Sequence, residues 1–468
     1  MLPIYVYDLI FLAIFGLAIA IFLYKNRKRV KIESKIIFMY RTKIGIKLMD
    51  WASKKFHGLL NVLGYFSIAF GYLMMLGAFV MFYFSIMLMS SLTTVTKVPP
   101  LMPLVPYLPQ IFDLPLPPFY FSYWLIIILI VAVTHEFAHG VFARHAKLKV
   151  KSTGFGFFGP FLAAFVEPDE RAMTKKSKKS QLAILSAGTF SNFIFAIIFI
   201  LVLQLFLFGC YEKVGITGYM YALESVNITN IEEINGYSFE DFINLSHEDL
   251  TNITETLPVK VNDQMYYLKP ELYSLLDSVK QGKTEIIYLY KDTPAIRANL
   301  SGALQEIDGE KINEIEDVSK ILVSHKPNET IKIKTNEGEY SITLAEHPKN
   351  SSVGYLGIGF PKFSGFALAI STITSPFFSP YAYAEPKYNL EVLQFFRDLF
   401  FWLILICLSV ALLNMLPLGI LDGGKFLYVT ALGLTGSKKK AETVFKLAAF
   451  VVLLIFLILM LFWFIKAF

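Results

Sequence analysis

Two histidines and a glutamate in the segment His135-Glu136-Phe137-Ala138-His139 are the residues of this chain best suited to chemistry. The segment lies within an apolar run over residues 119–142, which predicts a helix. On a helix, residues four apart lie about 40° apart around the axis and one turn apart along it. Both imidazoles can then reach one metal ion, with Glu136 beside the open coordination position. The alternatives are a chance match or polar residues that join helices by hydrogen bonds.

A metal site of this kind needs a third protein ligand. His145 follows six residues after His139, but a continuing helix places it about 9 Å along and about 240° around, too far to share an ion. Asp422 lies in the segment 414–425, where Pro417 and three glycines interrupt an apolar helix. Broken backbone at membrane depth is tolerated only where it is buried in protein or lines a cavity. We therefore expect Asp422 to be the third ligand; the alternative is that it caps a short helix from Lys425 onward.

The composition is that of an integral membrane protein with some soluble mass. The 468 residues are 55% hydrophobic and 17% charged, with a mean hydropathy of +0.54. The two cysteines, Cys210 and Cys407, are too few for a disulfide framework and exclude a cysteine-based zinc site. Residues 211–362 carry a net charge of −10 and the remainder +16, much of it beside apolar segments. These basic flanks indicate membrane-surface contacts and no nucleic-acid site.

Six apolar runs are long enough to cross a bilayer, which takes about 20 helical residues. They cover residues 4–24, 59–89, 119–142, 182–208, 392–413 and 445–465. Basic residues follow the first run and no small-residue cleavage site does, so we interpret this run as a membrane helix and not as a signal peptide.

The loops between these runs define a topology. The basic loops all fall on one side, which the positive-inside rule assigns to the cytosol: 25–55, 147–179 and 437–441. The acidic region 211–362 is then extracytosolic. Within the second basic loop, turn signals predict an apolar hairpin that enters the membrane edge. The proline-rich stretch 99–118 predicts an external loop or re-entrant cap without a helix.

Residues 211–362 mix helical and strand periods, as an α+β domain does. We expect a helix over residues 293–300, a strand and turn at 304–312, a helix over 318–324, and paired strands at 330–335 and 340–344. The segment 231–237 echoes residues 307–312, which indicates a partial repeat.

Three segments together resemble the site-2 protease family of intramembrane zinc metalloproteases: HEFAH at 135–139, SAGTFSN at 186–192 and NMLPLGILDGG at 414–424. That family combines HExxH with a remote LDG, often preceded by NxxP. The unit 293–360, which ends in Gly-Tyr-Leu-Gly-Ile at 354–358, resembles the PDZ domains that many members carry between catalytic helices. The resemblance implies a polytopic α-helical membrane protein with about six transmembrane helices and an inserted α+β PDZ-like extracytosolic domain.

The resemblance also implies the site residues. His135, His139 and Asp422 become zinc ligands, and Glu136 becomes the general base. Asn192 or Asn414 would hold the oxyanion or the unwound substrate strand. Thr189 stands where a proline is common in the family.

The implied organisation has five parts. Residues 1–57 form the first transmembrane helix and a basic cytosolic loop, and residues 58–210 form the half of the catalytic membrane core that contains HExxH. Residues 211–362 form a soluble region, of which about 285–362 is PDZ-like. Residues 363–390 form an interfacial or re-entrant segment, and residues 391–468 form the half of the core that contains LDG.

The expected activity is cleavage of a transmembrane helix in single-pass or other membrane-protein substrates, with the site toward the cytosolic side of the cell membrane. The PDZ-like domain would accept a peptide end. One alternative is the membrane HExxH class that trims prenylated C-termini, which takes a Glu as third ligand; no Glu lies in a span after His139. The other is a non-catalytic scaffold, which need not retain both histidines, Asp422 and Glu136.

Overall fold

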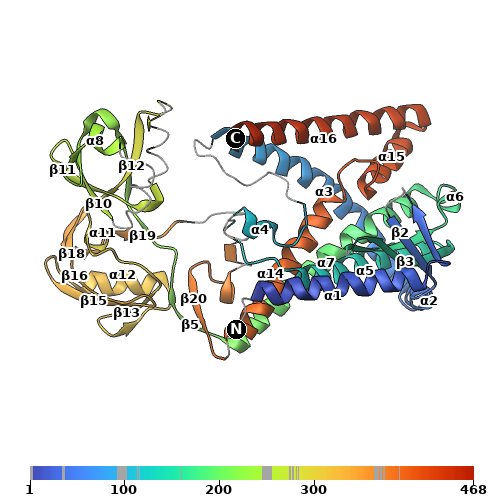
Figure 1. Cartoon of the computed structure of the whole chain (residues 1–468), viewed down its shortest axis with the longest axis horizontal. Coiled ribbons are helices and arrows are strands. Elements are labelled where there is room, and N and C mark those ends of the chain that lie inside the picture. Colours follow the sequence, from blue (N-terminus) through green and yellow to red (C-terminus); the bar gives the residue numbers. More distant parts are fainter. Residues whose placement is uncertain are drawn as a thin grey trace. The chain divides into compact units, whose positions relative to one another are not determined.

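Six long apolar helices run through the part of the chain that the computed structural model describes (Figure 1). They are α1 (Ile4–Lys25), α3 (His57–Ser91), α5 (Phe121–His145), α7 (Lys178–Cys210), α14 (Leu390–Leu413) and α16 (Lys438–Ala467). Each is long and apolar enough to cross a membrane, which confirms the predicted number of spans. The described residues are 4–33, 37–91, 103–112, 114, 116–159, 161–244, 256–272, 276, 279–280, 282, 284–362, 368, 371–372, 375–388 and 390–467.

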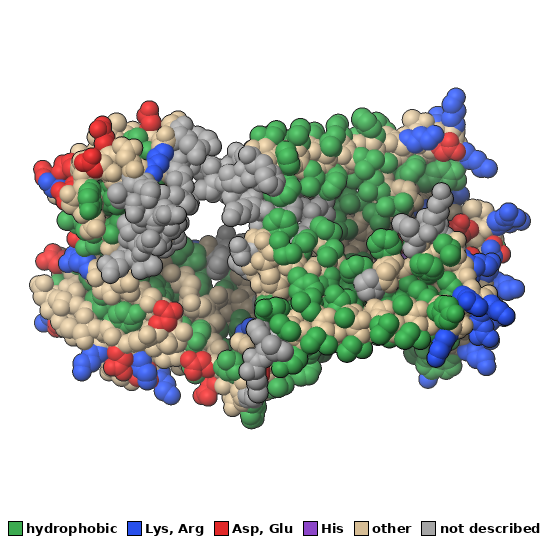
Figure 2. All heavy atoms as spheres, viewed as in Figure 1, with side chains coloured by type: hydrophobic (Ala, Val, Ile, Leu, Met, Phe, Trp, Pro, Cys, Tyr) green, Lys and Arg blue, Asp and Glu red, His purple; other side chains and the backbone are tan. Residues whose placement is uncertain are grey.

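The chain forms two units. The first, the membrane unit, contains residues 1–203 and 394–468, and the second, the β-rich unit, contains residues 204–393. Hydrophobic side chains cover the flank of the membrane unit in Figure 2, and Lys and Arg side chains gather at the end that carries α2 (Ile46–Lys55) and α6 (Glu170–Met173). Helices that are apolar all round, with charge only at one end, are the pattern expected for lipid-facing spans.

A four-stranded antiparallel sheet lies in the membrane unit, in the order β1-β2-β3-β4. Its strands are β1 (Val30–Glu33), β2 (Ile37–Thr42), β3 (Val150–Phe158) and β4 (Phe161–Pro168). The β3–β4 pair is the predicted hairpin, whereas β1 and β2 lie in a segment that we expected to be only a basic loop. Because β2 pairs with β3 at Tyr40 and Phe155, far apart in the sequence, local periodicity does not reveal this pairing.

A buried carboxylate connects α1 to the start of α5. Asp8 accepts hydrogen bonds from the backbone N–H groups of Phe121 (2.7 Å) and Ser122 (3.0 Å), and from the Tyr107 hydroxyl. These two N–H groups belong to the first turn of α5, where no intrahelical acceptor exists. Asp8 therefore caps the helix that carries HEFAH. Tyr107 lies just before α4 (Leu108–Ile111), a one-turn helix within the stretch where we expected none.

The β-rich unit contains two hydrophobic cores, each under its own six-stranded sheet. The first sheet has the order β7-β12-β11-β10-β8-β9, with strands β7 (Leu223–Asn227), β12 (Ile286–Lys291), β11 (Gln264–Leu268), β10 (Leu257–Val261), β8 (Ile231–Ile234) and β9 (Tyr237–Ser238). Short helices among the described residues of this part include η1 (Ile228–Asn230), α8 (Phe239–Ile243) and η2 (Pro270–Leu272).

The second sheet has the order β16-β15-β13-β5-β20, and β14 pairs with β13. Its strands are β16 (Glu339–Thr343), β15 (Thr330–Thr335), β13 (Leu304–Ile307), β5 (Tyr211–Ile216), β20 (Ala382–Pro386) and β14 (Glu310–Lys311). Two small pairs complete this part, β17 (Ala345–His347) with β18 (Asn350–Tyr355) and β6 (Met220–Tyr221) with β19 (Ile358–Gly359). Its helices are α11 (Pro294–Arg297) and α12 (Ile315–Ser324), with η3 (Pro376–Phe378) before β20.

The first sheet is an insertion within the second. Strands β5 and β6 belong to the second sheet and its satellite pair, and the chain returns to that sheet only at β13. Ile216 of β5 accordingly lies in one core with Leu304, Ile331 and Leu356. The predicted boundary near residue 285 thus omits the segment that contains β5 and β6. Within the predicted interfacial segment 363–390, residues 382–386 form β20, and much of the segment before them lies outside the described residues.

The partial repeat is a repeated local structure. Strands β8 and β9 join through Asn235 and Gly236, and strands β13 and β14 join through Asp308 and Gly309, all four residues with positive φ. A helix follows each hairpin, α8 in one case and α12 in the other. Asn-Gly and Asp-Gly favour such two-residue turns because both positions need left-handed backbone.

Candidate metal centre

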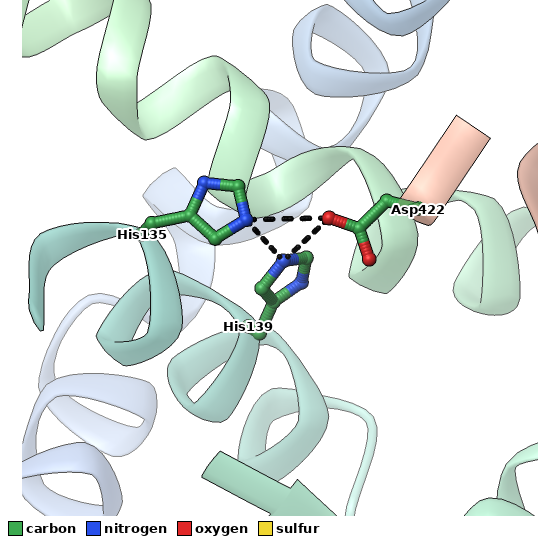
Figure 3. A group of neighbouring side chains, drawn as sticks. All are labelled: His135, His139 and Asp422. Carbon is green, nitrogen blue, oxygen red and sulfur yellow. Dashed lines mark hydrogen bonds and ion pairs between the residues drawn. The ribbon is translucent and has the colours of Figure 1, made fainter. Parts of the chain in front are cut away.

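His135 and His139 lie one turn apart on α5 and point the same way (Figure 3). Their Nε2 atoms lie 3.1 Å apart, and both rings are largely buried, with side-chain exposures of 8% and 11%. The α-helix places them as the four-residue spacing predicts.

Asp422 is brought to the histidines by a tight turn between α14 and α15 (Asp422–Thr435). The turn closes through the Gly423 N–H, which donates to the Asn414 carbonyl at 2.8 Å. A Cβ on Gly423 would collide with the carbonyl of Met415, so the two backbone segments meet only because this residue has no side chain. Asp422 is therefore the first residue of a helix that begins against the broken end of another.

The three donor atoms form a nearly equilateral triangle. Asp422 Oδ2 lies 3.2 Å from His135 Nε2 and 3.1 Å from His139 Nε2. Nitrogen and oxygen donors at about 2.0–2.2 Å from a tetrahedral zinc ion lie about 3.3–3.6 Å apart. The triangle therefore fits one face of a zinc tetrahedron to within a few tenths of an ångström. Among the described residues, it is the only group of three or more His, Cys, Asp or Glu side chains that could hold a metal ion.

The protonation of His139 suits metal binding. Its Nδ1 donates a hydrogen bond to the backbone carbonyl of Ile184, at 2.7 Å. A carbonyl can only accept, so Nδ1 carries a proton, and in the neutral ring the lone pair then lies on Nε2. This contact sets the tautomer and orientation that a metal-ligating histidine needs.

Asn192 and Asn414 both contact His135. The amide of Asn192 is fully buried, with Nδ2 3.0 Å from His135 Nδ1. The amide of Asn414 lies on the other side of the ring, with Nδ2 3.3 Å from His135 Nε2. Asn192 therefore contacts the ring nitrogen that is not part of the donor triangle, whereas Asn414 contacts the one that is.

Glu136 is next to the donor triangle in sequence but has a separate partner. Its Oε2 accepts a hydrogen bond from the backbone N–H of Val166 in β4, at 2.8 Å. Strand β4 pairs only with β3 among the described strands, so this N–H belongs to its open edge. The sheet thus holds the carboxylate that follows His135.

A comparison with protein-family models matches residues 123–459 to peptidase family M50, well over half of the chain. The chain belongs to this family. M50 peptidases are zinc metalloproteases of the site-2 protease type, so the chain is a membrane-embedded enzyme of that class. The match begins within α5 and ends within α16, and it includes every residue of the donor triangle. A search of curated proteins found no match.

His145 lies apart from the donor triangle of this M50 peptidase, as the helix geometry predicts. Its Nε2 lies 3.0 Å from Asn61 Oδ1, and its ring lies 4.6 Å from that of His57. These partners are at the start of α3. The histidine therefore belongs to a separate polar cluster.

Several supporting groups of the M50 site could not be located from the sequence. The Ile184 carbonyl and the Val166 N–H are backbone groups, which any residue type supplies. Gly188 is one residue of the SAGTFSN segment at 186–192, and nothing in that segment indicates that it faces the donor atoms. Ile184 lies within one helical turn before the SAGTFSN segment at 186–192. That proximity is the sole sequence signal for the contact between its carbonyl and His139.

Gly188 of α7 faces the donor atoms directly. A Cβ at this position would overlap Nε2 of both His135 and His139. We expect Gly188→Ala to lower the zinc affinity of the purified protein at least about tenfold, because the methyl group takes part of the space that the ion needs. Competition with a chromophoric chelator measures this affinity.

Gly209→Ala is the matched control, because it is the same change in the same helix and its Cβ would meet no atom within 4 Å. Alanine is the better helix former by about 1 kcal/mol, so helix propensity alone would not produce a loss. Wild-type zinc affinity in Gly188→Ala would contradict this account of the space between the donors.

Proposed function

We propose that this chain is a zinc-dependent intramembrane endopeptidase that cuts a transmembrane helix of another membrane protein. The observation that carries the proposal is the triangle of His135, His139 and Asp422. Both histidines lie on α5, which is long and apolar enough to cross a bilayer, and Asp422 begins α15 directly after the turn that ends another such helix, α14. Ionisable groups at such positions are expensive and mark functional sites. Their geometry fits zinc, and the family supplies the reaction class.

The ligands in this proposal are His135 Nε2, His139 Nε2 and one oxygen of Asp422. A zinc ion bound there would lower the pKa of a water molecule toward neutrality and polarise the scissile carbonyl. For His135 to present a lone pair at Nε2, its Nδ1 must carry the proton. Asn192 Oδ1 can accept a hydrogen bond from this N–H if the side-chain amide rotates by 180°. The rotation exchanges Nδ2 and Oδ1, which are similar in size.

Glu136 acts as general base in this proposal. Its carboxylate takes a proton from the attacking water and later delivers it to the leaving amine. The hydrogen bond from Val166 occupies only one lone-pair region of one oxygen, so the carboxylate keeps acceptor capacity while its orientation is held. Asn414, beside the donor triangle, can donate its amide N–H to the developing oxyanion.

A substrate helix must unwind locally before it is cut, because its carbonyl groups are shielded by their own hydrogen bonds. We therefore expect substrates with helix-weakening residues such as Gly, Pro or Asn near the cleavage site. The basic end of the membrane unit supports a cytosolic position for that end, and HEFAH lies in the half of α5 that leads to it.

The cofactor and the cleavage position are tested together with the purified protein in liposomes. The substrate is a single-pass segment with a central Gly-Pro pair, and mass spectrometry of the products locates the cut. We expect a cut inside the membrane segment, complete loss of cleavage after treatment with a zinc chelator, and recovery with added Zn²⁺. Cleavage outside the segment, or cleavage that persists in metal-free protein, would contradict the proposal.

The β-rich unit is proposed to be extracytosolic, and its part at about residues 285–362 is proposed to be a PDZ-like module that accepts a peptide end. A groove of about 350 Å³ lies between α12 and the segment from β18 to β19, with Leu322, Val323 and Ile358 among its lining residues. Among the described strands, β19 pairs only with β6, so its other edge is available to an added strand. The groove supports a module that selects substrates by a free end or excludes those with bulky external domains.

Removal of the module tests this filter. The Lys387 N–H donates to the Cys210 carbonyl at 2.9 Å, so residues 211–386 can be deleted and the remaining ends joined directly. We expect the shortened enzyme to cleave substrates that retain large external domains, which the full chain rejects. Cleavage of a series of substrates with external domains of increasing size measures the change. Unchanged selectivity would argue against a filter.

A further inference from the structure

An apolar cavity of about 220 Å³ lies beside Glu136. Residues 42–49, the strands β3 and β4, and helix α5 together enclose it, with Leu48, Phe137, Phe155 and Ala164 among the lining side chains. Among the described residues that line it, Glu136 is the only one with a charged side chain. A cavity of about 150 Å³ lined by aliphatic and aromatic side chains accommodates a benzene ring. The volume beside Glu136 is therefore sufficient for the side chain of a leucine, methionine or phenylalanine.

The cavity lies on the side of Glu136 where we expect the substrate residue that follows the scissile bond. In the proposed reaction, Glu136 returns its proton to the leaving amine, so the residue that carries this amine lies closest to the carboxylate. That residue follows the cut and becomes the new N-terminus of the product. Its side chain can enter the cavity that Glu136 borders.

We propose that this cavity is a specificity pocket that binds a large apolar side chain of the substrate residue immediately after the cut. The inference rests on the proposed proteolytic function and adds the side-chain preference to it. Polar or charged side chains are disfavoured because the lining offers them few partners. Glycine and alanine leave much of the apolar surface without contacts.

Two neighbouring alanines of β4 form a matched pair that tests this pocket. Ala164 lines the cavity and lies opposite Phe155 of β3, which also lines it. Ala163 lies opposite Gly156, and neither is among the lining residues. Ala164 is half-buried and lines the cavity, whereas Ala163 is exposed and does not. Ala164→Leu therefore fills the cavity, and Ala163→Leu adds the same group outside it.

The experiment uses the full-length purified enzyme in liposomes and substrates that differ only in the residue after the cut: Gly, Ala, Leu, Phe or Asp. For the wild type, we expect kcat/KM for Leu or Phe to exceed that for Ala about tenfold or more. Ala164→Leu should reverse or abolish this preference, and Ala163→Leu should retain it. Zinc content and thermal stability of each variant show whether the protein remains folded.

A photo-crosslinking amino acid at the same substrate position provides a readout that is independent of turnover. In the Glu136→Gln background, we expect crosslinks to residues 44–49 or to β4, and their loss in Ala164→Leu. Equal rates for all five substrates, or an unchanged preference in Ala164→Leu with zinc bound, would overturn the pocket while leaving the protease intact. If instead no substrate is cleaved by the zinc-loaded wild type, the proposed function itself fails. Crosslinks only to lipid would identify the cavity as an acyl-chain site and also overturn the proposal.

Discussion

Replacement of Glu136 by glutamine is expected to lower cleavage of a transmembrane substrate about a thousandfold while zinc content stays at the wild-type level. Glutamine has nearly the same shape and can still accept the hydrogen bond from the Val166 N–H through its amide oxygen. It cannot take a proton from water at neutral pH, and general base catalysis contributes about 10²- to 10⁴-fold in enzymes. Product formation in liposomes and metal analysis of the same preparation measure the two quantities.

Glu170→Gln is the matched control for this prediction. Glu170 is exposed, and its carboxylate accepts from Lys425 at 2.7 Å, away from the donor triangle. We expect it to retain wild-type cleavage, because surface ion pairs contribute little to stability. Undiminished cleavage by Glu136→Gln would remove the basis for a general base at this position.

In the same assay, Asn414→Ala should keep zinc and lower kcat more than it raises KM, because an oxyanion contact strengthens in the transition state.

Replacement of Asp422 by alanine is expected to remove stoichiometric zinc and, with it, all measurable cleavage. Asp422 is the only carboxylate in the donor triangle, and its loss leaves two neutral imidazoles that cannot balance a divalent cation in a largely buried site. Metal analysis of the purified variant, followed by titration with Zn²⁺, measures the loss. We expect less than about a tenth of the zinc of the wild type after dialysis, since a missing ligand costs more than the about 10- to 100-fold of a lost outer contact.

Asp398→Ala is a suitable comparison because Asp398 is another aspartate of the membrane unit, and it is buried. Its carboxylate contacts Arg397 at 3.2 Å and lies outside the donor triangle. This variant should lose stability but retain zinc, whereas Asp422→Ala should lose zinc. Equal zinc content in wild type and Asp422→Ala would show that another group completes the site. The proteolytic mechanism would then need a different ligand set.

Much of this protein follows from local sequence patterns. Hydropathy and charge predict the six membrane helices, because a helix in lipid must be apolar over about 20 residues and its flanks carry the topology signals. The alternating residues of β15 and β16 predict that pair, and the Asp-Gly turn predicts the β13–β14 hairpin. The four-residue spacing of His135 and His139 determines a metal-binding face before any fold is known.

Other features depend on contacts between distant segments. Strand β2 has no periodic signal of its own. It pairs on one side with the adjacent β1 and on the other with β3, which follows more than a hundred residues later. The second sheet begins with β5, which precedes an entire inserted sheet, so local patterns do not assign β5 to the same sheet as β13. The capping role of Asp8 likewise needs α1 to lie against the start of α5.

The residue types thus determine which donor atoms are available, whereas the folded chain determines how these atoms are arranged. The sequence determined that two imidazoles share one helical face and that a carboxylate follows a broken apolar helix. Only the tertiary structure decided that Asp422 completes a triangle with 3.1–3.2 Å sides, that the Ile184 carbonyl orients His139, and that Gly188 leaves room at the donors. The physical reason is that spacing along a helix is set by local backbone geometry, whereas the approach of α5, α7 and α15 depends on the packing of side chains from all three helices.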